Sequence, residues 1–127
     1  MKDEVKQNAN YGSDLKQRTR EYAVRIIHLC ESLPKNTTSF VIGKQVLRSG
    51  TSVGAQYREA KRAKSDADFI SKIEGSLQEL DETSYWLELL VEAAIVRKEL
   101  LEPLMKETDE LIAILTTVVK NVKMRKK

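Results

Sequence analysis

Apolar residues recur at steps of three and four along most of the chain, which is the spacing of an amphipathic helix. Four such stripes can be traced, and short polar segments separate them. No stretch alternates apolar and polar residues with a period of two, so strands are not expected. The pattern predicts an all-α protein with helices at about 14–33, 39–64, 66–94 and 98–123.

The first predicted helix has an inward-facing stripe made of Leu15, Thr19, Tyr22, Ile26, Leu29 and Leu33. Ser13 and Asp14 offer side chains that could cap its start. Pro34 ends it, because the residue before a proline is pushed out of the helical region. Residues 1–12 are polar and lack periodicity, so we expect a flexible N-terminal arm there.

The second predicted helix carries a run of small residues, Gly-Thr-Ser-Val-Gly, at 50–54. A loop is the alternative interpretation of such a run. The apolar residues on both sides keep one helical phase, which favours a helix, and their stripe consists of Ile42, Val46, Ser49, Val53, Tyr57 and Ala60. Gly43, Gly50 and Gly54 fall on the neighbouring stripe, where missing side chains would let another helix approach closely.

The third and fourth predicted helices have the most regular repeats. Ser65 and Asp68 resemble a capping box with Asp in place of Glu, and Thr37, Thr38 or Ser39 could cap the second helix. The third stripe consists of Ile70, Ile73, Leu77, Leu80, Ser84, Leu87, Val91 and Ala94. The fourth consists of Leu101, Leu104, Thr108, Leu111, Leu115, Val118 and Val122. Short connections force antiparallel neighbours, so we expect an up-down-up-down four-helix bundle at 13–123.

Composition agrees with a single helical domain. The chain has 127 residues, of which 41% are hydrophobic and 32% charged, with only two prolines. The one cysteine, Cys30, excludes an intrachain disulfide and fits a reducing cytoplasm. No apolar run has membrane-spanning length, and no signal-peptide pattern follows Met1. We therefore expect a soluble cytoplasmic protein without a membrane partner.

Basic residues form two groups that could contact nucleic acid. The net charge of +3 is concentrated near the C-terminus, including a basic tail at 124–127. Phosphate contacts need only positioned cations. The candidates for RNA or DNA binding are Lys44, Arg58, Lys61, Arg62, Lys64, Lys123, Arg125, Lys126 and Lys127. An alternative for the tail is that cations at a helix end are favoured by the helix dipole.

Some charged residues are better candidates for structural roles. Glu79 can face the second helix, so we expect an ion pair among Arg48, Glu59 and Glu79, with Arg48 or Arg58 as the cationic partner. An arginine that is paired in this way is less available to phosphate.

A second apolar surface is indicated on the third helix. Trp86 lies far around the helix from the centre of the predicted core stripe, so Tyr85, Trp86, Leu89 and Leu90 are candidates for a subunit interface. The alternative is that Trp86 widens the core.

Signals for catalysis are absent. His28 is the only histidine, and Cys30 diverges from it on the helix, so neither a metal site nor a catalytic pair is expected. The Glu-x-x-His motif of di-iron bundles does not occur. We expect no enzyme activity, no cofactor and no small-molecule substrate.

Three segments carry a resemblance to a known family. They are R-S-G-T-S-V-G-A-x-Y-R-E-A at 48–60, D-F-I-x-K-I at 68–73 and E-T-S-Y-W-L-E-L-L at 82–90. The chain resembles the bacterial four-helix-bundle proteins encoded by intervening sequences of 23S rRNA genes, formerly called ribosomal protein S23. The resemblance covers roughly 15–122. It implies a four-helix bundle that assembles as a homopentamer. It also implies kinship with the accessory variability determinant proteins of retroelements, which engage nucleic acid and reverse transcriptase.

Two hypotheses of function follow. The first is a non-catalytic oligomeric module that binds nucleic acid through basic surfaces. The second is a structural or protein-interaction module that self-assembles or binds a partner helix through the glycine stripe and the Trp86 surface.

Overall fold

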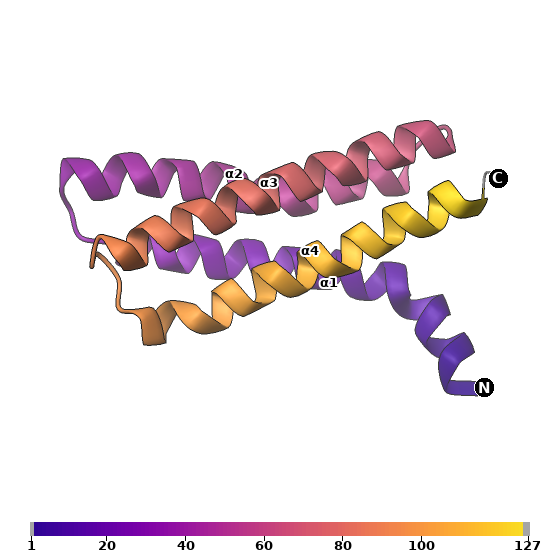
Figure 1. Cartoon of the computed structure of the whole chain (residues 1–127), viewed down its shortest axis with the longest axis horizontal. Helices are drawn as coiled ribbons and strands as arrows, with labels where there is room; N and C mark the ends of the chain where they lie inside the picture. The colour runs from indigo at the N-terminus through magenta and orange to yellow at the C-terminus, as the bar shows by residue number, and fades with distance from the viewer. Residues whose placement is uncertain (1, 126–127) are drawn as a thin grey trace.

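The computed structural model describes the backbone of residues 2–125 and the side chains of residues 14–125. Its elements, in chain order, are α1 (Lys2–Ser32), α2 (Thr37–Lys61), α3 (Asp66–Glu92) and α4 (Lys98–Arg125), with no strand in the described part. Figure 1 shows the helices running along one long axis, with the chain reversing direction at each short connection. The predicted all-α class and four-helix bundle are confirmed.

The helix boundaries differ from the predicted ones mainly at the start of the chain. α1 begins at Lys2, so Ser13 and Asp14 do not cap its first turn. No proline interrupts residues 2–13, and nothing in their sequence stops a helix from continuing toward the N-terminus. The side chains of the predicted arm at 1–12 lie outside the described residues, and its mobility stays a prediction. α2 ends at Lys61 rather than at 64.

Side-chain caps determine where α2 and α3 begin. The cap of α2 is Asn36, whose side-chain oxygen accepts a hydrogen bond from the Ser39 amide at 2.9 Å. Thr37, Thr38 and Ser39, which were the predicted caps, lie within the helix. Ser65 Oγ accepts from the Asp68 amide at 3.0 Å, as predicted. The Asp68 carboxylate accepts from the Lys64 amide at 3.3 Å, one residue before the position that a capping box uses.

All four helices contribute to one hydrophobic core. The predicted stripes of α1, α2 and α4 are buried almost throughout, although Leu29, Ile42 and Val118 are only half-buried and Val119 takes the inner place on α4. The fully buried Tyr22 hydroxyl lies 2.7 Å from Thr108 Oγ1, which joins α1 to α4. Burial raises the pKa of Tyr22 to about 12.

The buried face of α3 is turned further toward α2 than its stripe predicts. Ser76, Thr83 and Leu90 are fully buried, whereas Ser84 and Val91 are half-buried and Ala94 is exposed. Ser76 Oγ donates to the Val53 carbonyl at 2.9 Å, and the Thr83 hydroxyl lies 2.7 Å from that of Ser49. These small hydroxyl residues let α3 lie close against α2 and rotate the core face toward it.

Gly50 and Gly54 lie inside a helix, so the loop interpretation is wrong, and the glycine stripe faces α1 of the same chain. A Cβ atom at Gly50 would lie 2.7 Å from Ile26 Cγ1, and one at Gly54 would lie 3.1 Å from Thr19 Oγ1. At Gly43 the nearest atom would be Leu33 Cδ1, at 3.1 Å. The close approach predicted for this stripe is therefore made by α1, which leaves no room there for a partner helix.

None of the helices in the described part combines the length and apolar character that a membrane crossing requires.

Candidate nucleic-acid interface

Three predicted cations meet at the end of the bundle that holds the α2–α3 turn. A surface hollow of about 490 Å³ is lined by Lys61, Lys64 and Arg125, and Asp66 is the one carboxylate among the described residues of its wall. Arg125 is the last residue of α4, which ends beside this turn (Figure 1). We call Lys61, Lys64 and Arg125 the turn cluster. Residues distant in sequence thus combine into one cationic surface.

Arg58 belongs to a second, smaller hollow between α1 and α2. It lines a space of about 270 Å³ together with Lys16 and Arg20, and none of the described residues that line it is acidic. We call Lys16, Arg20 and Arg58 the groove cluster. Its other walls are formed by Thr19, Ala23, Thr51, Gly54 and Ala55. Arg62, exposed, follows Arg58 by one helical turn and leads toward the turn cluster.

Lys16 and Arg20 were missed by the sequence analysis. A signal for them exists: neither has an acidic residue three or four positions away, and the same holds for Arg58. Such positions are neighbours on a helix surface, so these cations lack an intrahelical partner. What the sequence does not show is that α1 and α2 place them in one hollow.

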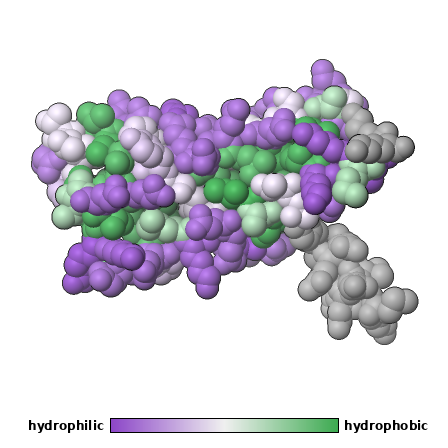
Figure 2. Space-filling view, viewed as in Figure 1, coloured by the Kyte–Doolittle hydropathy of each residue, from purple (hydrophilic) through white to green (hydrophobic). Residues whose placement is uncertain are grey.

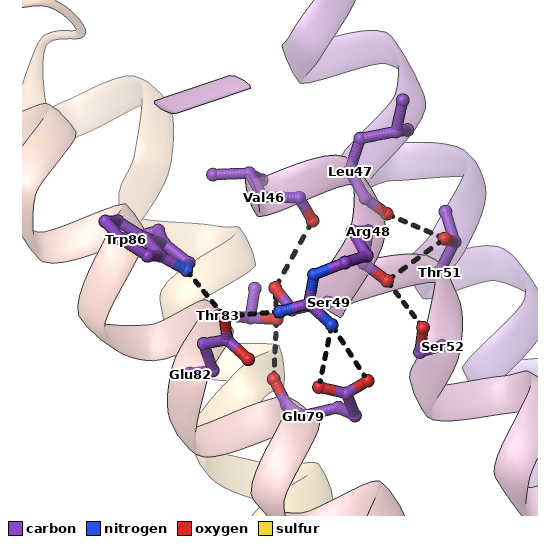
Figure 3. A network of polar contacts seen from close by, with 10 residues as sticks. All are labelled: Val46, Leu47, Arg48, Ser49, Thr51, Ser52, Glu79, Glu82, Thr83 and Trp86. Carbon is purple, nitrogen blue, oxygen red and sulfur yellow. Dashed lines mark hydrogen bonds and ion pairs between the residues drawn. The ribbon is translucent and has the colours of Figure 1, made fainter. Parts of the chain in front are cut away.

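Arg48 has a different environment, which Figure 3 shows. Its guanidinium donates to Glu79 at 3.4 Å and also pairs with Glu82, whose carboxylate accepts from Trp86 Nε1 at 3.3 Å. The hydrogen bond from Arg48 lowers the pKa of the Glu82 carboxyl, and Glu82 in turn raises the pKa of Arg48. The predicted pairing of Arg48 with Glu79 is present.

Two further ion pairs involve predicted residues. Glu59 accepts from Lys72 at 2.9 Å rather than from an arginine, and this bond raises the pKa of Lys72. Lys123 lies 3.4 Å from Glu74, so part of its charge is matched by a carboxylate.

Lys44 lies away from the other predicted cations. Its Nζ is 5.4 Å from the centre of the Phe40 ring, a cation–π distance. At 1.5 Å per residue it is about 21 Å along α2 from Arg58. The structure therefore does not bring it into the cationic surface. Lys126 and Lys127 lie outside the described residues.

The aromatic residues of α3 divide into two kinds. Trp86 is half-buried against the core, as the alternative interpretation holds, and its ring meets that of Tyr85 edge-on at 5.2 Å. Leu90 is fully buried inside the chain, so its assignment to a subunit interface is wrong. The error arises because the core face of α3 is rotated toward α2. Tyr85, 54% exposed, and the half-buried Leu89 remain interface candidates.

An apolar hollow of about 560 Å³ lies beside the α1–α2 turn, where Cys30, Phe40 and Leu47 contribute to its wall. The Cys30 thiol donates to the Gly43 carbonyl at 3.4 Å, and burial raises the pKa of this thiol, which disfavours the reactive thiolate. His28 is exposed. Within the described residues no group of three His, Cys, Asp or Glu side chains could hold a metal ion.

Comparisons with known proteins agree with the fold. The family model for the 23S rRNA-intervening sequence protein matches residues 13–117. The chain is 41% identical to a protein of unknown function from the S23 ribosomal protein family of Bacteroides thetaiotaomicron VPI-5482, known from a crystal structure. That match covers 86% of this chain and 97% of the other, with a TM-score of 0.81. No curated protein matches the chain. The chain belongs to the family of 23S rRNA-intervening sequence proteins.

Proposed function

We propose that the protein is a non-catalytic cytoplasmic module that binds nucleic acid through the phosphate backbone. The observation that supports this is the turn cluster, in which one hollow is lined by Lys61 of α2, Lys64 of the α2–α3 turn and Arg125 of α4. Arg58 and Arg62 extend the positive surface along α2. Phosphate contacts of this kind supply affinity and position a strand without reading its sequence.

Recognition of single bases is not part of this proposal. Base stacking requires exposed aromatic rings beside the cationic surface, and none of the described residues that line the two cationic hollows is a Tyr or Trp. Phe69 lines the turn hollow but is half-buried against the core. Binding should therefore depend strongly on salt and weakly on sequence. Because the family takes its name from 23S rRNA, a ribosomal RNA fragment is the first probe to use.

The test is filter binding of RNA and DNA fragments at several salt concentrations. Replacing Lys61, Lys64 and Arg125 by Gln should flatten the slope of log K against log salt by about 2 for a single strand, from about 0.7 per contact. The matched control replaces Lys35, Arg97 and Lys106 by Gln, which removes the same charge from exposed positions elsewhere. No retention of either nucleic acid at low salt, or equal loss in both triple variants, would contradict the proposal.

We also propose that the chain assembles as a homo-oligomer, a homopentamer by the family resemblance. Support comes from apolar side chains that an isolated chain exposes, such as Phe40 at 66%, Leu100 at 64% and Tyr85 at 54%. Figure 2 shows apolar residues along the α3–α4 face and at the end that holds the α3–α4 connection. If nucleic-acid binding fails, assembly alone defines the alternative function, a structural module.

Light scattering tests this second proposal. Phe40→Ser with Tyr85→Ser should lower the measured mass, because a buried interface would lose two aromatic anchors. Trp86→Ala is a poor test, since Trp86 also packs on the core of its own chain. A monomeric mass for the unmodified protein would contradict assembly.

A further inference from the structure

The groove cluster combines features that the turn cluster lacks. Its hollow lies between two packed helices, and among residues 14–125 three cations and no carboxylate line it. In the turn cluster, by contrast, Asp66 shares the wall with the cations. The groove hollow is therefore the more selective environment for an anion.

No ion pair within residues 14–125 neutralises the charges of the groove cluster. Among the side chains of residues 14–125, none pairs with Lys16, Arg20 or Arg58 within salt-bridge distance. Arg18, two residues from Lys16, shows the contrast: it turns toward α4 and contacts Glu107 at 2.6 Å. That hydrogen bond raises the pKa of Arg18. Over residues 16–20, α1 thus presents one cation that is paired with a described carboxylate, Arg18, and two that are not, Lys16 and Arg20.

Like charges four residues apart on a helix repel each other. Lys16 and Arg20 have this spacing on α1. An anion bound between the two helices would attract all three cations that line the hollow and offset their mutual repulsion. Arginine adds a planar set of donors that matches phosphate oxygens, and lysine adds a point charge.

Small residues keep the hollow open and narrow. Gly54 brings α2 against α1, because a Cβ atom there would lie 3.1 Å from Thr19 Oγ1. Ala23 and Ala55 line the same space and leave it free of long apolar side chains. The volume of about 270 Å³ is more than large enough for one phosphate group.

We infer that the hollow between α1 and α2 is a binding site for one phosphate group, held by Lys16, Arg20 and Arg58. If a nucleic-acid strand supplies that phosphate, the inference rests on the proposed function and adds a defined anchoring point for the strand. A strand that follows Arg58 and Arg62 toward the turn cluster would place one phosphate in the hollow. Free phosphate or a mononucleotide offers the same chemistry.

The test is an NMR titration of the full chain at constant ionic strength, with the amides of Thr51 and Gly54 as reporters. The probes are inorganic phosphate, adenosine monophosphate and a short single-stranded RNA. Each should give saturable shifts at Thr51 and Gly54 that disappear in Lys16→Gln with Arg20→Gln. The control variant, Lys35→Gln with Lys106→Gln, loses the same charge and should keep the shifts. For RNA, losing two contacts should weaken binding about tenfold or more at low salt and flatten the salt slope by about 1.4.

The outcomes separate the site from the proposed function. If RNA binds but shifts only amides near the α2–α3 turn, and the Lys16–Arg20 double variant binds it normally, the phosphate site is wrong and nucleic-acid binding stands. If phosphate shifts Gly54 while no RNA binds at low salt, the site stands with free phosphate as its ligand and the proposed function fails. Equal shifts with chloride at the same ionic strength, or none with any probe, overturn the site.

Discussion

Along the flank of α2 that faces α3, Arg48 is matched by Glu79 and Glu82 of the neighbouring helix. Along the flank that faces α1, Arg58 shares a hollow with two further cations and, in the part of the chain whose side chains are described, no carboxylate. Both arginines are exposed and lie on one helix. The acidic residues of the neighbouring helix, rather than the arginine itself, therefore decide the role of an exposed arginine on α2. With such a residue nearby the arginine stabilises the bundle, and without one it is free to bind an anion.

The two flanks also differ in how the helices come close together. Toward α3, buried hydroxyls make hydrogen bonds between the helices, as Ser76 does to the Val53 carbonyl. Toward α1, missing side chains let Ile26 and Thr19 lie directly against Gly50 and Gly54. Packing against glycines is sensitive to added volume, whereas packing through hydroxyl hydrogen bonds is sensitive to the loss of a hydroxyl. The predictions below use this difference, beginning with the largest effect.

Gly50→Leu should lower the free energy of unfolding by about 3 kcal/mol, because its side chain would collide with buried Ile26. Gly75→Leu is the control. The three atoms nearest to a Cβ atom at Gly75 all belong to the flexible end of the Gln56 side chain, which can move aside, so this change should cost less than about 1 kcal/mol. Urea unfolding of both variants measures the effect. Equal losses would show that the α1–α2 flank is not packed more tightly than the α2–α3 flank at these positions.

Ser49→Ala should lower the free energy of unfolding by about 1 kcal/mol, since it removes a buried hydrogen bond to Thr83. Thr83 keeps its bond to the Glu79 carbonyl at 2.7 Å and is not left unsatisfied. Ser52→Ala is the matched control, because its hydroxyl donates only to the Arg48 carbonyl at the surface. Thermal or urea unfolding should show almost no change for this control. A neutral Ser49→Ala would mean that the hydroxyl contacts do not stabilise the α2–α3 flank.

Arg48→Met should cost between about 0.2 and 1 kcal/mol at neutral pH, the range for exposed ion pairs. Because Arg48 lowers the pKa of Glu82 below its usual 4.5, the pair's contribution is complete above pH 4.5. It is lost as the pH falls through the lower folded-state pKa. The difference from the unmodified protein, measured by urea unfolding, should therefore shrink in acid. Arg58→Met should show no stability loss at neutral pH. A constant Arg48→Met difference down to pH 3 would contradict the ion-pair account.

The fold follows from the sequence because the inward stripes keep phase over whole helices. Leu15, Tyr22 and Ile26 of α1 occupy the core as their spacing predicts. The helical interpretation of 50–54 succeeds for the same reason, since Val46 and Val53 keep one phase across Gly50. The N-terminal limit of α1 was missed because residues 2–13 contain neither a clear apolar period nor a helix-stopping residue.

The site is less predictable, because it depends on how helices are turned and aligned. Polar residues on one face of α3 rotate it toward α2, which places Leu90 in the core and Trp86 beside it. The contact of Arg18 with Glu107 joins residues 89 positions apart, and only the alignment of α1 with α4 brings them together. The groove cluster arises in the same way from α1 and α2. The pairing of Arg48 with Glu79 was accessible, since Glu79 could be placed on the side of the third helix that faces the second.

The measurement that tests the central claim most directly compares RNA binding by Arg58→Gln and Arg48→Gln as a function of salt. Both variants lose one charge from an exposed position of α2. The claim predicts weaker binding and a salt slope flatter by about 0.7 for Arg58→Gln, with Arg48→Gln unchanged because Glu79 and Glu82 already match that arginine. Equal losses for the two variants, or a larger loss for Arg48→Gln, would contradict it.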